Sequence, residues 1–152
     1  MYYIGTKIIK ADPMTYDEFV EKVKPIEYSG SCKEGYEVVY EDGYTSWSPK
    51  DVFDKSYIGI KNDTNTITEC IVDEFIDNIE VSKLGERTTL VKVTLKNGFI
   101  LTETSSSITS DKFDMEIGKR ICISKIKDKV WELLGFLLIT AKNGVDGSYK
   151  NK

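Results

Sequence analysis

The sequence comprises 152 residues, of which 40% are hydrophobic and 30% are charged. This balance is typical of a folded soluble protein and fits one ordinary domain or two very small ones. Histidine is absent, which removes the commonest general base and the commonest zinc ligand. The net charge of −4 argues against binding to duplex nucleic acid, since proteins that bind duplexes usually carry a basic excess.

The cysteines and the apolar runs indicate the compartment. Cys32, Cys70 and Cys122 are an odd number without Cys-x-x-Cys spacing, so we expect neither a disulfide framework, a metal site nor a cofactor. The longest apolar run lies around residues 133–139, far short of the roughly 20 residues that span a bilayer. The N-terminal residues also lack the layout of a signal peptide. We therefore expect a reducing cytoplasm and no membrane partner.

Residues 1–58 predict a small α+β module. The β-branched and aromatic content predicts a strand over residues 2–9. Thr15 and Glu18 have the spacing of a capping box, which predicts a helix over residues 16–24.

A hairpin follows in the same module. The dipeptide Asp42-Gly43 predicts a turn between strands over residues 36–41 and 44–47. Ser48-Pro49 then predicts a short helix, with Ser48 as its cap and Pro49 at its first position. Two aromatic side chains of the hairpin are expected in the core: Tyr44 and Trp47.

Residues 59–152 predict a second domain built around a β-hairpin. Residues 67–76 suggest a strand, although an acidic helix over residues 70–78 fits the same sequence. Strict alternation over residues 86–96 predicts a half-buried strand. The Asn97-Gly98 turn then predicts an antiparallel return over residues 99–104.

A long final helix completes the second domain. It is expected to begin after a cap at Ser110 or Asp111 and to end before Asn143, with Gly118 loosening it near its start. Its apolar residues follow a spacing of three to four, and we expect Trp131 and Leu134 to be buried against the sheet. The expected fold is therefore α+β: a small α+β module, then an antiparallel β-sheet packed on a long C-terminal helix.

Motifs for catalysis are missing from the sequence. Gly118-Lys119 lacks the glycine and the Ser/Thr of a phosphate-binding P-loop, and no Gly-x-Gly-x-x-Gly occurs. The serine cluster at residues 105–110 has no histidine partner and no Ser-x-x-Lys motif. We therefore expect a protein that is not an enzyme and has no catalytic residues.

A basic stretch on the final helix suggests an anion-binding site. Five Lys or Arg residues lie between Lys119 and Lys129, with Asp128 as the one acid among them. Lys125 and Lys129 are one helical turn apart, so both can face one phosphorylated ligand. The same lysines are also typical of an ordinary solvated helix face. The candidate ligand-binding residues are Phe99, Thr109, Phe113, Lys125, Lys129, Arg87 and Ser105.

Two stretches resemble phage proteins. Residues 7–57, KIIKADPMT…GYEVVYEDGYTSWSPKDVFDKSY, resemble a module found at the N-terminus of many tailed-phage and prophage proteins. Residues 94–138 resemble a family of small tailed-phage proteins whose pattern is a Gly-Phe strand, a serine-rich turn, Phe-Asp-x-x-Ile-Gly and Trp-x-Leu-x-Gly. The same arrangement is similar to the Thoeris anti-defence one family of phage sponge proteins.

The resemblance implies a function and an assembly. Sponge proteins of this kind capture cyclic ADP-ribose isomers, and some relatives capture cyclic oligonucleotides, without cleaving them. The resemblance implies ligand contacts from Phe99, Thr109, Lys125 and Lys129. It also implies a homo-oligomer, either a dimer or a multiple of dimers, that acts in the cytoplasm of the bacterial host. Lysines stand where relatives have arginines, and lysine binds phosphate without a bidentate fork.

Two other functions fit the sequence. Residues 1–58 carry 7 basic against 11 acidic residues, so this module can act as an inhibitor that binds a host protein, as a mimic of nucleic acid. The other alternative is an enzyme that degrades a cyclic nucleotide. Recovery of intact nucleotide from the denatured complex distinguishes a sponge from such an enzyme.

Overall fold

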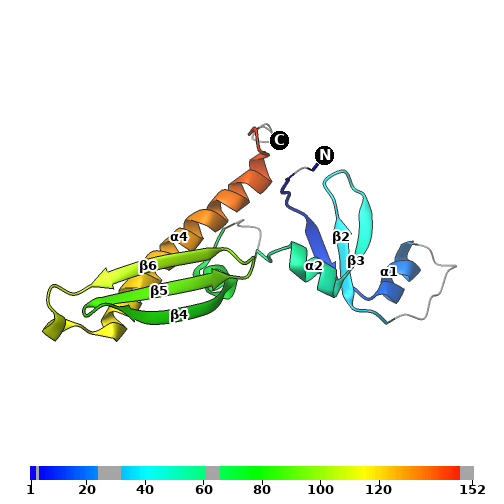
Figure 1. Ribbon diagram of the computed structural model, residues 1–152. Coiled ribbons are helices and arrows are strands. Elements are labelled where there is room, and N and C mark those ends of the chain that lie inside the picture. Colours follow the sequence, from blue (N-terminus) through cyan, green and yellow to red (C-terminus); the bar gives the residue numbers. More distant parts are fainter. Residues whose placement is uncertain (3, 24–31, 61–65, 148–152) are drawn as a thin grey trace. The chain divides into compact units, whose positions relative to one another are not determined.

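The computed structural model describes the chain except residues 3, 24–31, 61–65 and 148–152. It divides into two compact units, Met1–Gly59 and Ile60–Ser148, called here the N-terminal unit and the C-terminal unit. Each unit has its own three-stranded antiparallel sheet and its own helices, as Figure 1 shows. The α+β fold expected from the sequence is confirmed, including the long C-terminal helix.

The N-terminal unit is a small sheet flanked by two short helices. Its strands β1 (Lys10–Pro13), β2 (Gly35–Val39) and β3 (Thr45–Pro49) lie in the order β1-β2-β3. Its helices are α1 (Tyr16–Val23) and α2 (Lys50–Ser56).

The first strand lies later in the sequence than predicted. Residues 2–9 have strand-forming composition, but the described part of this segment is neither helix nor strand. Pairing begins at Lys10, which lies opposite Val39, the last residue of β2. Residues before Lys10 have no β2 residue left to pair with, which explains why composition alone misplaced the strand.

The capping box of α1 is confirmed in detail. The Glu18 carboxylate accepts hydrogen bonds from the Thr15 backbone N–H and hydroxyl, both at 2.8 Å. The Glu18 N–H donates back to the Thr15 hydroxyl at 3.3 Å. These bonds hold the pKa of Glu18 below its ordinary value. The start of α2 differs from the prediction, since this helix begins at Lys50 and Ser48 makes no cap.

The two helices contact opposite faces of the small sheet. Tyr16 of α1 packs on Trp47, and Phe53 of α2 stacks on Tyr36. The Lys22 ammonium of α1 binds the buried Glu37 carboxylate with both distances at 2.7 Å. Trp47 is half-buried, and its indole N–H donates to the Met14 carbonyl at 2.9 Å. Tyr44 is 64% exposed, so the expectation that it belongs to the core was wrong.

The C-terminal unit has two layers, a sheet and a helical layer. After α3 (Glu69–Phe75), the strands β4 (Ile76–Leu84), β5 (Thr88–Leu95) and β6 (Ile100–Ser106) form a sheet in the order β4-β5-β6. A 3₁₀ turn at Ser110–Lys112 leads to α4 (Met115–Asn143), which crosses one face of this sheet diagonally (Figure 1).

Helix α3 corresponds to the acidic helix that the sequence offered as the alternative to a strand in this region. Val72 and Phe75 lie one and four residues after Ile71, which places the three side chains on one face of α3. Ile71 and Val72 are buried in the main core, and Phe75 packs against it. The strand suggested for residues 67–76 instead begins at Ile76 and continues as β4.

The hairpin of β5 and β6 confirms the alternation in the sequence. Residues of β5 alternate strictly between buried and half-buried, with Val91 and Val93 fully buried on the face beneath α4. Gly98 takes a φ of 82° in the turn, a conformation that glycine adopts without strain.

The long helix begins later than its predicted cap. Asp114, not Ser110 or Asp111, is the cap, since its carboxylate accepts from the backbone N–H groups of Glu116 and Ile117 at 2.8 and 3.1 Å. Ser110 instead starts the separate 3₁₀ turn. A continuous helix of 29 residues follows, so Gly118 does not break it.

The core lies between α4 and the sheet. Residues four apart on α4 form its helical side, while β5 and α3 supply most of the rest. The buried α4 residues are Gly118, Cys122, Ile126, Val130 and Leu134. Burial raises the pKa of the Cys122 thiol, so this side chain remains a neutral part of the core.

Trp131 does not belong to this core. Its side chain is 42% exposed, while Leu134 is 3% exposed as expected. The C-terminal part of α4 also extends beyond the sheet (Figure 1), which leaves Phe136 and Ile139 exposed. The expected burial of Trp131 was therefore wrong, because the buried row follows Val130 and Leu134 and Trp131 lies beside it.

Gly118 allows α4 to approach β5 closely. A Cβ atom at this position would lie 2.2 Å from the Thr89 Oγ1 atom and 2.7 Å from its Cβ. We therefore expect Gly118→Ala to reduce the free energy of unfolding by about 1–3 kcal/mol, as overpacking does. Urea denaturation measures the change.

Gly135 provides the control within the same helix. No atom lies within 4 Å of a Cβ placed there, so Gly135→Ala is expected to stabilise the protein by about 0.5–1 kcal/mol through helix propensity. Equal effects of the two substitutions would contradict the close contact between α4 and β5.

Candidate functional site

A row of six partly exposed side chains runs along α4 beside the buried residues. We call it the α4 row: Ile117, Ile121, Lys125, Lys129, Leu133 and Leu137. Its members follow a spacing of four, so each lies next to the following one and the row winds gradually around the helix. The apolar members are between 40% and 47% exposed, and two cations stand at the centre. The row therefore combines an apolar surface with positive charge.

The α4 row borders the edge strand β6. The Lys129 ammonium donates to the carboxylate of Glu103, whose side chain is 17% exposed. This hydrogen bond, followed by the charges of Lys129 and Lys125, holds the pKa of Glu103 below its ordinary value despite its burial. A carboxylate and two ammonium groups thus lie together where α4 crosses β6.

The cations of α4 are less free than the sequence predicted. Lys127 lies on the side of α3, where Asp73 binds it at 2.7 Å and raises its pKa. Lys119 lies 4.0 Å from Glu116, and Lys129 is paired with Glu103. Lys125 forms no ion pair with any described residue. The basic stretch therefore does not form one continuous positive surface.

The pair of Glu103 and Lys129 predicts a pH effect on stability. The pKa of Glu103 is lower in the folded chain than its ordinary value of 4.5, so its ionised form stabilises the fold at neutral pH. This contribution is lost as the pH falls through the carboxyl range. We expect the melting temperature of the parent to fall more between neutral and acidic pH than that of Glu103→Gln.

Glu80→Gln is the matched control for this measurement. Glu80 also binds a lysine, Lys92 at 2.9 Å, but the pair lies on the opposite face of the sheet and is more exposed. The Glu80 substitution is expected to leave the pH profile close to that of the parent. A parent-like profile for Glu103→Gln would contradict the role of the Glu103 carboxylate.

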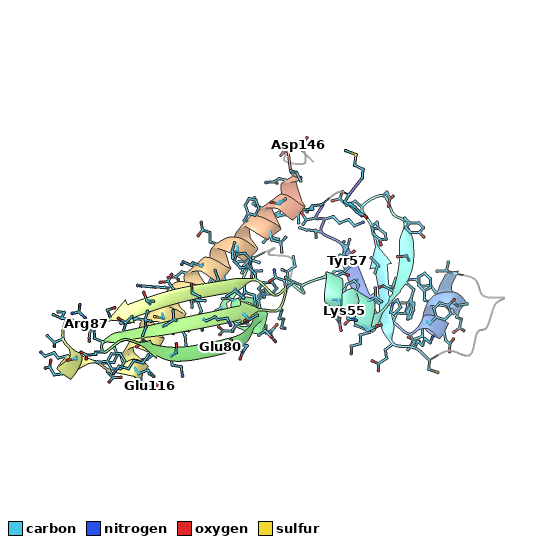
Figure 2. All side chains as sticks on the ribbon, viewed as in Figure 1. Lys55, Tyr57, Glu80, Arg87, Glu116 and Asp146 are labelled. Atoms are coloured by element: carbon cyan, nitrogen blue, oxygen red, sulfur yellow. The ribbon has the colours of Figure 1, made fainter. Side chains whose placement is uncertain are left out.

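A second group of candidate residues lies at one end of the sheet. Figure 2 shows Arg87 and Glu116 at this end. The Arg87 guanidinium donates to the Ile108 carbonyl at 2.6 Å, and the Ser107 N–H donates to the Arg87 carbonyl at 2.9 Å. Arg87 therefore holds the connection between β6 and α4 in place, in addition to its expected role as a cation.

The remaining candidates at this end have different surroundings. Phe113 is half-buried, and the Lys83 ammonium lies 4.6 Å from the centre of its ring. Thr109 precedes the 3₁₀ turn and makes no side-chain cap. Ser105 is half-buried on β6, two residues from Glu103 and therefore on the same face. These three residues lie close to the start of α4.

Phe99 lies at the opposite end of β6. It follows the Asn97-Gly98 turn, and its side chain is 51% exposed. Four residues separate it from Glu103, which corresponds to about 13 Å along a strand. A single copy of the chain therefore does not bring Phe99 together with Thr109 or Arg87, which lie beyond the other end of the strand.

The sequence analysis did not include Glu103 among the candidates. The signal was present, because the alternation that places Leu101 toward the core places Glu103 on the same face. A charged residue at an inward position of an amphipathic strand needs a partner, and the amphipathic helix that follows this strand carries lysines beside its apolar stripe.

The described residues contain few features of other kinds of site. None of the helices in this part of the chain combines the length and apolar character needed to cross a bilayer. Within the same residues, no three Cys, Asp or Glu side chains are gathered closely enough to hold a metal ion. Among the described residues, Glu103, Lys125 and Lys129 form the cluster of opposite charges that is the candidate site.

Comparison with protein families identifies a bacteriophage protein. The profile of the phage protein (N4 Gp49/phage Sf6 gene 66) family matches residues 63–142, just over half of the chain. The chain belongs to this family. Comparisons with curated proteins and with solved structures find no match. The matched range lies within the C-terminal unit, and the prediction of a phage protein from the sequence is confirmed.

Proposed function

We propose that this phage protein is an anti-defence sponge that sequesters a nucleotide-derived immune messenger without cleaving it. A cyclic ADP-ribose isomer is the proposed ligand, with cyclic oligonucleotides as a related class. The protein acts in the cytoplasm of the bacterial host, as a homo-oligomer. Membership of a phage family supports the setting, and the resemblance of residues 94–138 to sponge proteins supports the ligand class.

The observation that carries the proposal is the pair of lysines beside β6. Lys125 and Lys129 are one helical turn apart, so both ammonium groups can reach a single diphosphate. Lys125 has no carboxylate partner among the described residues and is available to an anion. Sequestration needs only such contacts, since binding alone lowers the concentration of free messenger.

Glu103 adds a second kind of contact to this site. An ionised carboxylate accepts hydrogen bonds and repels phosphate, so it favours a ligand that also carries hydroxyl or amino donors. The two hydroxyls of a ribose and the exocyclic amine of adenine are such donors. A site with two ammonium groups and one carboxylate therefore suits a nucleotide better than inorganic phosphate.

Thermal-shift screening against cyclic nucleotides tests the proposal. The full chain is expected to gain thermal stability with at least one cyclic ADP-ribose isomer or cyclic oligonucleotide. The complex is then denatured by heat, and chromatography of the supernatant is expected to recover the nucleotide intact. A degraded nucleotide would identify an enzyme, and the absence of any shift across the panel would reject the sponge.

The N-terminal unit supports a second candidate function. It lies outside the matched range of the family, and residues 1–58 carry an acidic excess of 11 against 7. An inhibitor that binds a basic host protein through this unit would show no shift with nucleotides. Loss of anti-defence activity after deletion of this unit, with nucleotide binding unchanged, would favour this alternative.

A further inference from the structure

The N-terminal unit carries most of the tyrosines of the chain but buries few apolar side chains. Eight of the nine tyrosines lie within residues 1–58. Among the described residues of this unit, Val38 is the one buried hydrophobic side chain, whereas the C-terminal unit has an extended core. Tyrosine is enriched where proteins bind one another, because its ring supplies contact area and its hydroxyl a hydrogen bond. The unit therefore has the composition of an interaction module.

Two of these tyrosines close the hairpin of β2 and β3. The Tyr40 N–H donates to the Tyr44 carbonyl at 2.9 Å, and the two rings stack with their centres 5.7 Å apart. The Tyr44 side chain is 64% exposed, and Tyr40 is half-buried. The end of this hairpin therefore presents a stacked aromatic pair to solvent.

A lysine of the same chain lies on this aromatic pair. The Lys7 ammonium is 4.2 Å from the centre of the Tyr40 ring, within the roughly 6 Å of a cation–π contact. Lys7 comes before β1, in a segment whose described residues are neither helix nor strand. It forms no ion pair with a carboxylate in the described part of the chain, so its ammonium is held by an aromatic ring.

Two carboxylates lie between the tyrosines in the turn. Glu41 and Asp42 are exposed, and neither is ion-paired with any described residue. One Asp42 carboxylate oxygen accepts a hydrogen bond from the Tyr44 N–H at 3.0 Å, which orients this side chain in the turn. Aromatic rings beside carboxylates suit a guanidinium, since this group stacks on rings and forms paired hydrogen bonds with carboxylates.

Lys7 fills this surface less well than an arginine would. Its ammonium is compact and strongly hydrated, whereas the planar guanidinium is less hydrated and covers more of a ring. A single cation–π contact at an exposed site is weak, so an arginine from another molecule can replace Lys7 at small cost. The side chains of Tyr2 and Ile4 are fully exposed, so they do not hold the N-terminal segment on the hairpin.

We propose that the end of the β2–β3 hairpin is a docking site for an arginine-bearing segment of a partner protein, and that Lys7 occupies this site until the partner displaces it. The acidic balance of residues 1–58, with 11 acidic against 7 basic residues, favours a basic partner. The proposal rests on the second candidate function and gives it a contact surface. The alternative is that Lys7 only fastens the N-terminal segment to the sheet.

Fluorescence anisotropy of a labelled octa-arginine peptide, mixed with the full chain, tests the role of Lys7. Lys7→Ala is expected to tighten binding about two- to fivefold, which corresponds to one exposed cation–π contact. Lys10→Ala is the matched control, because it removes the same charge from the start of β1, opposite Val39. At about 0.15 M salt, charges more than roughly 8 Å apart are largely screened, so Lys10→Ala is expected to bind as the parent does.

Substitutions of Tyr44 test the aromatic surface. Tyr44→Ala is expected to weaken binding of the octa-arginine peptide about two- to fivefold and to reduce its advantage over an octa-lysine peptide. Tyr44→Phe keeps the ring and is expected to bind as the parent does. Both variants are expected to fold, since Tyr44 is largely exposed, and circular dichroism checks this.

The outcomes separate the proposal from its alternatives. Tighter binding by Lys7→Ala than by Lys10→Ala, together with weaker binding by Tyr44→Ala than by Tyr44→Phe, supports the docking site. Equal binding within either pair, or no binding by both the parent and Lys7→Ala, overturns it. Binding by the parent that no hairpin substitution changes would leave the second candidate function with a different surface. All measurements are made without nucleotide, so none of these results bears on the proposed sponge.

Discussion

Replacing Ile126 by alanine is expected to reduce the free energy of unfolding by about 2–5 kcal/mol. The Ile126 side chain is fully buried between α4 and the sheet, in the middle of the core of the C-terminal unit. Truncation removes apolar contacts and leaves a cavity that the rigid sheet cannot fill. Urea denaturation followed by circular dichroism gives the change in unfolding free energy.

Trp131→Ala is the contrasting substitution in the same helix. Trp131 is larger than Ile126, but 42% of its side chain is exposed, so we expect a loss of no more than about 1–2 kcal/mol. A loss for Trp131→Ala larger than that for Ile126→Ala would show that this side of α4 is covered in solution.

Substitution of the two central lysines is expected to weaken nucleotide binding without unfolding the protein. Lys125→Ala removes one charge-assisted contact, which corresponds to about a tenfold to hundredfold rise in dissociation constant. Lys129→Ala is expected to weaken binding further, because it also leaves the Glu103 carboxylate facing the ligand without its partner. Isothermal titration calorimetry with the nucleotide identified by screening measures both effects.

Lys92→Ala is the matched control for these variants. Lys92 also binds a carboxylate, that of Glu80 at 2.9 Å, but it lies on the face of the sheet opposite α4. Its removal is expected to leave the dissociation constant unchanged. Lys92→Ala and Lys125→Ala should melt near the parent, whereas Lys129→Ala should fold but melt at a lower temperature, because it leaves the Glu103 carboxylate without its cation. Parent-like binding by Lys125→Ala and Lys129→Ala would place the ligand elsewhere.

Local patterns were sufficient to predict much of the fold. The capping box at Thr15, the turn at Asp42-Gly43 and the alternation along β5 each depend on neighbouring residues, and the structure confirms all three. The strand predicted for residues 2–9 would need β2 as its partner, but β2 ends at Val39, which lies opposite Lys10. Composition carries no information on where a partner strand stops.

The burial along α4 shows a similar limit. The apolar residues of this helix form a wide band, and the sequence cannot say which row within it faces the sheet. The close approach of Gly118 to Thr89 places the row containing Ile126 in the core and leaves Trp131 at its margin. That contact joins residues 29 positions apart, beyond the reach of helical periodicity.

The candidate site was predicted in part. The spacing of Lys125 and Lys129 placed both on one side of α4, as the structure shows. Their carboxylate neighbours were not predicted, because Glu103 and Asp73 lie on other elements that only the tertiary fold brings close. The separation of Phe99 from Thr109 likewise follows from the length of β6, which no single motif reveals.

The Glu103 carboxylate also acts as a built-in counterion. It balances Lys129 before any ligand arrives, so fewer dissolved ions need to condense around the two lysines in the free protein. Fewer ions are then released when an anion binds. The affinity of the proposed site is therefore expected to fall less steeply with salt concentration than that of a site with two unpaired lysines.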